Sequence, residues 1–252
     1  MLSPFERFAV RVMREANVAR PTALWQRQVL LRFVGGVLRR RTTVHGLDRV
    51  PNGPGERILL VANHRTFFDL FALGWILLEK RGLKQSVSFP VRANFFYENP
   101  AGLAVCLVMS GGSMYPPFFR AAEKKAANKE MLQHLIELLQ KPGQLVGFHP
   151  EGTRGTGDDP YQLLPAKPGV GELALKARPT VVPAFINGMG NSVLGELRSK
   201  NPIVVVFGEP IPLPEPEGEL RLSHYKRCAD LFNEHIAKLG EEEKHIRAAL
   251  PR

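Results

Sequence analysis

Apolar and polar residues alternate along this chain of 252 residues in blocks that predict strands and helices in turn. Short apolar runs bounded by charged, Gly or Pro residues are typical of buried strands, and they occur at 58–62, 86–91, 145–146, 180–185 and 203–207, after a first short strand and turn at 43–48. Apolar residues at helical spacing predict helices at 121–140 and 225–239, followed by a charged tail from 241. We therefore predict an α/β fold, with a mixed, mostly parallel sheet flanked by helices and an N-terminal amphipathic helical pair.

The predicted N-terminal helical pair, residues 1–41, carries a large excess of positive charge. It holds nine Arg, no Lys and only two acids, Glu6 and Glu15, which gives a local net charge of +7. Pro21 separates two segments in which apolar residues, Trp25 and Phe33 among them, recur at helical spacing. A basic amphipathic helix with aromatic residues on its apolar side is typical of a membrane interface. The alternative is a helical hairpin that packs on its own domain and leaves its Arg side chains in solvent.

The composition narrows the class of partner. A formal net charge of +10 and a pI near 9.9 predict an anionic partner, either nucleic acid or an anionic membrane surface, and no nucleic-acid recognition motif is present. The longest apolar segments, 70–78 and 103–109, fall short of the roughly eighteen residues of a spanning helix and are predicted as core. The N-terminus has no apolar region typical of a signal peptide, so we expect a monotopic protein. Two cysteines give neither a disulfide framework nor a metal-ligand spacing, which fits a reducing compartment.

The buried strand at 58–62 runs into the stretch Asn63-His64-Arg65-Thr66-Phe67-Phe68-Asp69. Thr66 is the predicted N-cap of a helix that ends near Gly82, with Asp69 at its third position. Because His64 lies in the turn before the helix, the chain can fold back so that Asp69 accepts a hydrogen bond from the imidazole. The second ring nitrogen is then free to take a proton from a hydroxyl. A lone His–Asp pair is more often structural than catalytic, so the choice between the two roles depends on a second stretch of the sequence.

That second stretch is Gly147-Phe148-His149-Pro150-Glu151-Gly152-Thr153-Arg154, which follows another predicted strand. Backbone amides of a glycine-rich loop and a guanidinium suit an anion such as phosphate. Taken alone, the same residues would also suit an ordinary turn with a solvated Arg.

Together the two stretches resemble the glycerolipid acyltransferase family of the PlsC type, the 1-acyl-sn-glycerol-3-phosphate or lysophosphatidic acid acyltransferases. The family's first motif, Asn-His-x4-Asp, corresponds to Asn63, His64 and Asp69. Its third motif, Phe-Pro-Glu-Gly-Thr-Arg, corresponds to 150–154, with His149 where the family has Phe.

The resemblance implies a division of roles among the site residues. His64 and Asp69 are the expected catalytic pair. The residues expected to form the substrate-binding site are Glu151, Gly152, Thr153, Arg154, Lys167 and Arg120. Among them, Glu151 is expected to act mainly as a scaffold for the loop. Arg120 stands where the second motif should lie, but two Pro and two Phe precede it, and its alternative is a solvated position at the start of a helix.

The resemblance also implies the reaction, which is acyl transfer from acyl-CoA or acyl carrier protein to the free hydroxyl of a lysophospholipid, with no cofactor and no metal. The expected domains are a membrane-associating arm at 1–41 and an α/β acyltransferase domain at 42–252. We expect a peripheral protein on the cytoplasmic face of the cell membrane that binds anionic lipid and no nucleic acid. Two alternatives stay open: another acceptor, such as a lyso-amino-acid lipid, and a non-catalytic lipid-binding protein.

Overall fold

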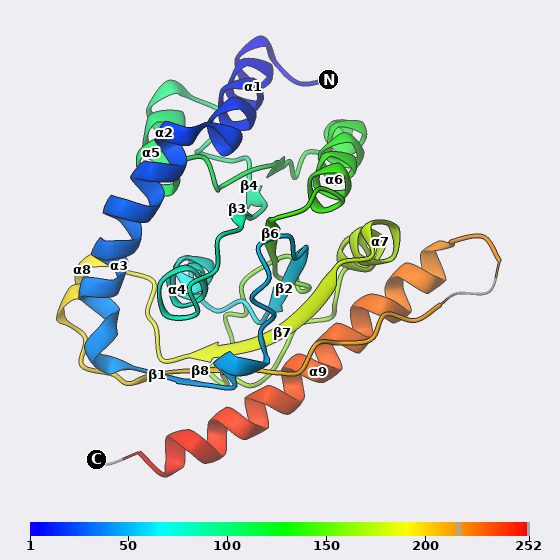
Figure 1. Cartoon of the computed structure of the whole chain (residues 1–252). Coiled ribbons are helices and arrows are strands. Elements are labelled where there is room, and N and C mark those ends of the chain that lie inside the picture. The colour runs from blue at the N-terminus through cyan, green and yellow to red at the C-terminus, as the bar shows by residue number, and fades with distance from the viewer. Residues whose placement is uncertain (216–217, 251–252) are drawn as a thin grey trace.

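The computed structural model describes residues 1–215 and 218–250 and shows a central sheet with helices on both faces (Figure 1). The six strands lie in the order β1-β8-β7-β2-β6-β3. In that order their bounds are Thr42–His45, Ile203–Phe207, Thr180–Asn187, Ile58–Ala62, Gln144–Phe148 and Ser86–Ser88. Strands β7, β2, β6 and β3 run parallel, whereas β8 runs antiparallel to β7 and pairs in parallel with β1 at the edge. The predicted mixed, mostly parallel α/β fold is confirmed.

Strand β2 at the centre of the sheet shows how the layers form. All five of its residues are buried, and they alternate between two cores: Ile58, Leu60 and Ala62 face one, Leu59 and Val61 the other. The first core is closed by α1 (Pro4–Val18), α3 (Leu31–Leu38), α4 (Asp69–Trp75) and α5 (Pro100–Ser110). The second is closed by α6 (Lys125–Leu139), α7 (Pro168–Ala177) and α9 (Leu222–Ala248). The apolar run of β2 is thus the buried centre of a three-layer fold.

The N-terminal helical pair is present and is divided next to Pro21, as predicted. Helix α1 begins with a capping box in which the side chains of Ser3 and Glu6 bond each other's backbone amides. It ends at Val18 with Ala19 as its C-cap, and Pro21 lies in the first turn of α2 (Arg20–Trp25). Helix α2 continues through a π-helical stretch, Gln26–Leu30, into α3 and a short 3-10 turn, Arg39–Arg41.

The arm has an inner side that packs on the domain and an outer side that does not. Met13 is fully buried, and a Cβ on Gly35 would lie 2.4 Å from Nε1 of Trp75, so α3 approaches α4 closely only because residue 35 is glycine. On the outer side, the side chains of Leu24 and Phe33 stay 61% and 58% exposed. In the part of the chain that the structure describes, no helix combines the length and the apolar character needed to cross a membrane.

Two predictions are corrected, one on where a helix begins and one on the burial of a helix. Helix α4 begins at Asp69 rather than directly after Thr66, because the Asp69 carboxylate accepts hydrogen bonds from the amides of Arg65 and Thr66 and folds the residues before it into a turn. Helix α5 is not wholly core: Val105 and Val108 face solvent on one side.

Other element bounds also differ from the prediction. The expected strand at 86–91 is divided by Pro90 into β3 and β4 (Val91–Arg92), and β4 pairs with β5 (Pro117–Phe118) in a second small sheet. Proline lacks the amide that a continuous strand would donate. Helix α9 continues to Ala248 through the segment predicted as a charged tail, and α8 (Val193–Arg198) was not predicted.

Candidate active site

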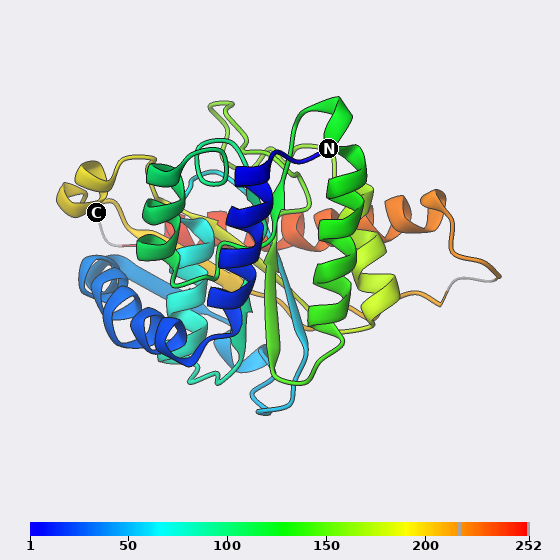
Figure 2. The same cartoon turned by 90° about the horizontal axis from the view of Figure 1, so that it is seen from above.

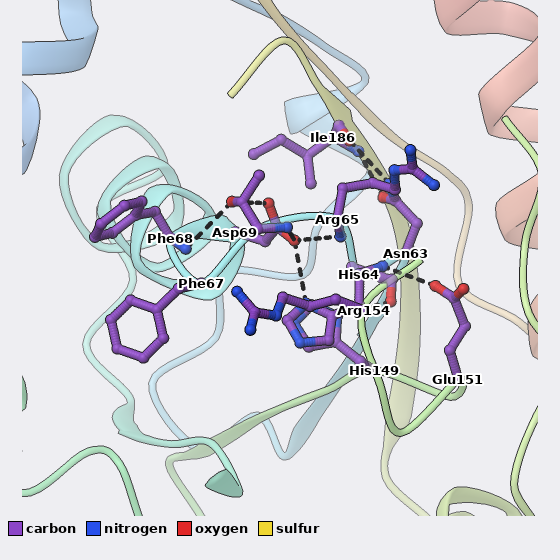
Figure 3. A network of polar contacts seen from close by, with 12 residues as sticks. Asn63, His64, Arg65, Phe67, Phe68, Asp69, His149, Glu151, Arg154 and Ile186 are labelled. Atoms are coloured by element: carbon purple, nitrogen blue, oxygen red, sulfur yellow. Dashed lines mark hydrogen bonds and ion pairs between the residues drawn. The ribbon is translucent and has the colours of Figure 1, made fainter. Parts of the chain in front are cut away.

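The loops that follow β2, β6 and β7 meet at one edge of the sheet. These strands are parallel neighbours, so their last residues, Ala62, Phe148 and Asn187, lie at the same edge. The carboxyl edge of such strands is the usual ligand-binding edge of an open α/β sheet. Both sequence stretches that we singled out lie in these loops (Figure 3).

Asn63 fixes the direction in which the chain leaves β2. Its buried side chain accepts a hydrogen bond from the Ile186 amide at 2.8 Å and donates one to the Ile186 carbonyl at 2.9 Å. These two bonds tie the residue after β2 to the neighbouring strand β7. The turn that starts at His64 is therefore anchored to the sheet.

The hydrogen bond expected between His64 and Asp69 is present, with 3.2 Å between Nδ1 and Oδ2. Asp69 is buried, whereas the side chain of His64 keeps 21% of its surface exposed. Because the carboxylate is an acceptor, Nδ1 of His64 carries the proton and Nε2 keeps its lone pair. The imidazole can therefore accept a proton from a hydroxyl that reaches Nε2.

The Asp69 carboxylate also holds the turn together. Oδ2 accepts hydrogen bonds from the amides of Arg65 and Thr66, each at 2.8 Å, and Oδ1 accepts one from the Thr66 hydroxyl at 2.6 Å. As the first residue of α4, Asp69 also lies at the positive end of the helix dipole. One buried charge therefore stabilises the turn and orients the His64 ring.

Glu151 joins the two loops through their backbones. One of its carboxylate oxygens accepts from the His64 amide at 2.8 Å and the other from the Leu164 amide at 2.7 Å. Burial raises the pKa of Glu151, although these two amide bonds act in the opposite direction. Because both oxygens are bonded to backbone amides, the geometry favours the scaffold role over contact with a substrate.

His149 stacks flat against His64. The ring centroids lie 3.9 Å apart and the ring planes differ by 7°. Nδ1 of His149 donates to the Ala62 carbonyl at 3.0 Å. Burial, and the positive charge that His64 can carry, lower the pKa of His149 to about 3. His149 is therefore neutral near pH 7, and it can lie against a protonated His64 without charge repulsion.

A cluster of three arginines, Arg92, Arg120 and Arg154, lies beside this turn. Arg92 at the end of β4 donates a hydrogen bond to the Thr153 hydroxyl. Burial and then the charges of Arg120 and Arg154 lower the pKa of Arg92. Within the described residues, none of the three forms an ion pair with an acid. Such a cluster attracts a phosphate, for which guanidinium groups offer matching donors.

Sequence analysis missed Arg92, because its partner Thr153 is 61 residues away in the chain. A single Arg after a short strand gives no signal of its own. The other predicted binding residues lie near the cluster: Gly152 adopts a left-handed φ of 65°, and the Lys167 side chain lies next to it. Lys167 itself is exposed at the start of α7.

His64, Asp69 and His149 bring potential metal ligands within 4.8 Å of one another. An imidazole binds a metal along the lone pair in its ring plane, at about 2.0–2.1 Å. The nearly parallel rings direct their lone pairs side by side rather than toward one ion. The oxygens of Asp69 already accept four hydrogen bonds. This arrangement favours proton transfer over metal binding.

An apolar groove opens beside the catalytic turn. It lies between the arm, α4 and α8, and apart from one acid its lining is apolar: Leu30, Phe33, Val34, Val37, Leu38, Phe68, Phe71, Ala72, Met109, Met189, Glu196 and Leu197. Phe68, which directly precedes Asp69 in the chain, lines the groove, so the groove lies next to the turn that carries the catalytic pair. Its apolar lining suits a hydrocarbon chain.

The chain is similar to a known protein family in sequence and to a solved structure in fold. A family model described as Acyltransferase matches residues 41–187, which include both loops. The chain belongs to the acyltransferase family. Among solved structures, the fold of this acyltransferase is similar to the 1-acyl-sn-glycerophosphate (LPA) acyltransferase PlsC from Thermotoga maritima, with a TM-score of 0.52. The two chains are 18% identical, and the match covers 94% of this chain and 89% of that one. No curated protein matches this acyltransferase in sequence.

Proposed function

We propose that this acyltransferase moves a fatty acyl group from a thioester donor to the free hydroxyl of a lysophospholipid, with 1-acyl-glycerol 3-phosphate as acceptor and phosphatidic acid as product. The observation that carries the proposal is that the arginine cluster and the apolar groove both lie beside the turn that holds the His64–Asp69 pair. The pair offers a base, the cluster an anion site and the groove a place for a hydrocarbon chain. A phosphorylated lysolipid has a matching group for each.

The proposed reaction needs no covalent enzyme intermediate. Nε2 of His64 takes the proton of the acceptor hydroxyl while the oxygen attacks the thioester carbonyl carbon. The tetrahedral intermediate then collapses, the carbon–sulfur bond breaks and the thiolate receives the proton from His64. Asp69 keeps Nδ1 protonated and stabilises the transient imidazolium. General-base catalysis of this kind contributes about 10²–10⁴-fold.

The acceptor's phosphate binds the arginine cluster in this proposal. Arg154 and Arg92 are its main donors, and the backbone of Gly152, the Thr153 hydroxyl and Arg120 are close to them. Lys167 lies at the rim, where it adds positive charge. The co-substrate is acyl-CoA or acyl carrier protein, and no further cofactor or metal takes part.

We also propose that the enzyme works at an anionic membrane surface, on the cytoplasmic face of the cell membrane, and that nucleic acid is not a partner. Helices α2, α3, α5 and α8 lie at the same end of the molecule in both views (Figures 1 and 2). Exposed apolar side chains occur on each of these helices: Leu24, Trp25, Phe33, Val105, Val108 and Leu197. Arg41 pairs with Glu196 and Arg27 bonds backbone carbonyls of the domain, but the exposed Arg among the nine in the first 41 residues add attraction to anionic lipid, at about 1 kcal/mol for each residue near the surface.

A second acceptor class, lyso-amino-acid lipids, is favoured by one observation. His149 places a neutral imidazole in the site where the family motif has Phe, and a ring nitrogen can bond polar groups that Phe cannot. A non-catalytic lipid-binding protein is less well supported, because binding alone does not require a base held by a buried carboxylate.

The deciding experiment uses the purified full chain and labelled acyl-CoA or acyl carrier protein. The acceptors are 1-acyl-glycerol 3-phosphate, its phosphate-free monoacylglycerol counterpart and a lyso-amino-acid lipid. We expect the highest kcat/KM with the phosphorylated acceptor and loss of transfer in His64→Ala. Folded wild-type protein that transfers acyl groups to none of the three would overturn the proposal.

A further inference from the structure

Asn191 contacts both halves of the site from a third loop. It lies between β7 and α8, and its side-chain oxygen Oδ1 accepts hydrogen bonds from Arg154 Nη1 at 3.3 Å and from the Phe67 amide at 3.3 Å. Arg154 belongs to the arginine cluster, and Phe67 belongs to the turn between His64 and Asp69 (Figure 3). Residue 191 lies beyond the 41–187 region that the family model matches.

The loop that carries Asn191 is held by its own contacts. Glu196 of α8 is almost fully buried, and its Oε1 accepts from the Gly190 amide at 2.6 Å. The other oxygen of Glu196 pairs with Arg41, whose guanidinium also donates to the Asn201 carbonyl at 3.1 Å. These bonds hold the loop next to Asn191 against α8 and the end of the N-terminal arm.

We propose that Asn191 is a positioning residue that sets the Arg154 guanidinium relative to His64 and thereby favours a phosphorylated acceptor. The inference rests on the proposed function. An amide oxygen is a neutral acceptor, so it fixes one donor of the guanidinium and leaves the positive charge and the remaining donors to the phosphate. A carboxylate in the same place would neutralise Arg154.

The hydrogen bond from the Phe67 amide connects Asn191 to the catalytic turn. In 1-acyl-glycerol 3-phosphate only two carbon atoms separate the phosphate ester oxygen from the free hydroxyl, so the anion site and the base must keep a matching separation. Asn191 is bonded to the loop of each, through Arg154 and through Phe67. It therefore holds the two parts of the site in register.

The test compares three variants of the full chain: Asn191→Ala, Asn191→Asp and, as a matched control, Asn201→Ala. Asn201 is exposed near α8, and its side chain makes no hydrogen bond within the described residues. Each variant is assayed with 1-acyl-glycerol 3-phosphate and with the phosphate-free monoacylglycerol. Circular dichroism melts establish that each variant is folded.

We expect Asn191→Ala to raise the KM for the phosphorylated acceptor about tenfold, the order of one hydrogen bond to a charged group. Asn191→Asp should raise it further, although it keeps an acceptor oxygen for the Phe67 amide. Both should raise the KM for the phosphate-free acceptor much less than the KM for the phosphorylated one. A merely structural role predicts the opposite order, because Asp would then support the loop better than Ala. Wild-type KM in both variants, or equal losses with both acceptors, would overturn the inference.

A binding measurement separates this inference from the proposed function. Lysophosphatidic acid is titrated into wild type, Arg154→Ala and Asn191→Asp without an acyl donor. If wild type binds the lipid but transfers no acyl group, the proposed function fails on its own. If Arg154→Ala weakens binding and Asn191→Asp does not, the role of Asn191 is wrong while the phosphate site stands.

Discussion

Replacing Asp69 with Asn tests the central pair by removing a charge while keeping the shape of the side chain. The asparagine oxygen can take the position of Oδ2 and accept from His64 Nδ1 and from the amides of Arg65 and Thr66. Its amide nitrogen then takes the position of Oδ1. The Thr66 hydroxyl donates to Oδ1 in the wild type, and in the variant it can rotate to accept a hydrogen bond from the amide nitrogen. All four partners stay paired, so only the negative charge is lost.

The expected magnitudes differ for stability and for turnover. Hydrogen bonds to a neutral group are weaker and the helix dipole loses its partner, but a neutral amide is easier to bury, so we expect the free energy of unfolding to fall by about 1–2 kcal/mol. Opposite unit charges about 4 Å apart interact with about 4 kcal/mol at an effective dielectric constant near 20. Without the Asp69 charge the imidazolium of His64 loses that stabilisation, so kcat should fall by about 10³-fold.

The assay measures kcat at saturating donor and acceptor, together with a thermal melt. Asp48→Asn is the matched control, because Asp48 is exposed and its carboxylate forms no hydrogen bond or ion pair within the described part of the chain. A folded Asp69→Asn enzyme whose kcat stays within tenfold of wild type would refute the role of the charge. An unfolded variant would refute the preserved hydrogen-bond geometry.

Three further predictions concern the phosphate, the membrane and pH. Arg154→Ala should raise the KM of the phosphorylated acceptor about 10–100-fold with a smaller effect on the donor, as steady-state kinetics will measure. The double variant Leu24→Glu, Phe33→Glu should sediment less with anionic vesicles, whereas the control Leu222→Glu at the start of α9 should sediment as the wild type does. Point variants are used because deletion of residues 1–41 would expose the core that the arm covers. In the folded protein the pKa of His149 is lowered from 6.5 to about 3, so the unfolded chain binds more protons between these values. The contribution of neutral His149 to stability should therefore be complete above about pH 6.5, and the free energy of unfolding should fall by at most about 1.4 kcal/mol per pH unit below it. In His149→Phe the melting temperature should depend less on pH between 6.5 and 4 than it does in wild type.

The sequence by itself determined the sheet and the centre of the site. Apolar runs identified the strands that carry the loops, because a strand covered on both faces must be apolar throughout. The spacing of His64 and Asp69 around a turn predicted their hydrogen bond, since these residues are local in the chain and few backbone paths join them. The alternation of strands and helices indicated the α/β class, because buried positions recur with a different period in strands and in helices and the apolar residues follow that period.

The sequence could not determine where helices begin or which distant side chains meet. Helix α4 starts at Asp69 because its carboxylate binds the turn before it, a choice that capping preferences alone did not resolve. Pro90 divided a segment that apolar character alone made continuous. Such bounds depend on individual hydrogen bonds rather than on a repeating pattern.

Tertiary structure alone decided the surroundings of the catalytic pair. The stack of His149 on His64, the contact of Arg92 with Thr153 and the bond of Asn191 to Arg154 each join residues that lie on different segments of the chain. Which side chains meet there depends on the order of the strands and on the path of each loop across the sheet edge. Loop paths follow from packing against neighbouring elements, and no period in the sequence encodes them.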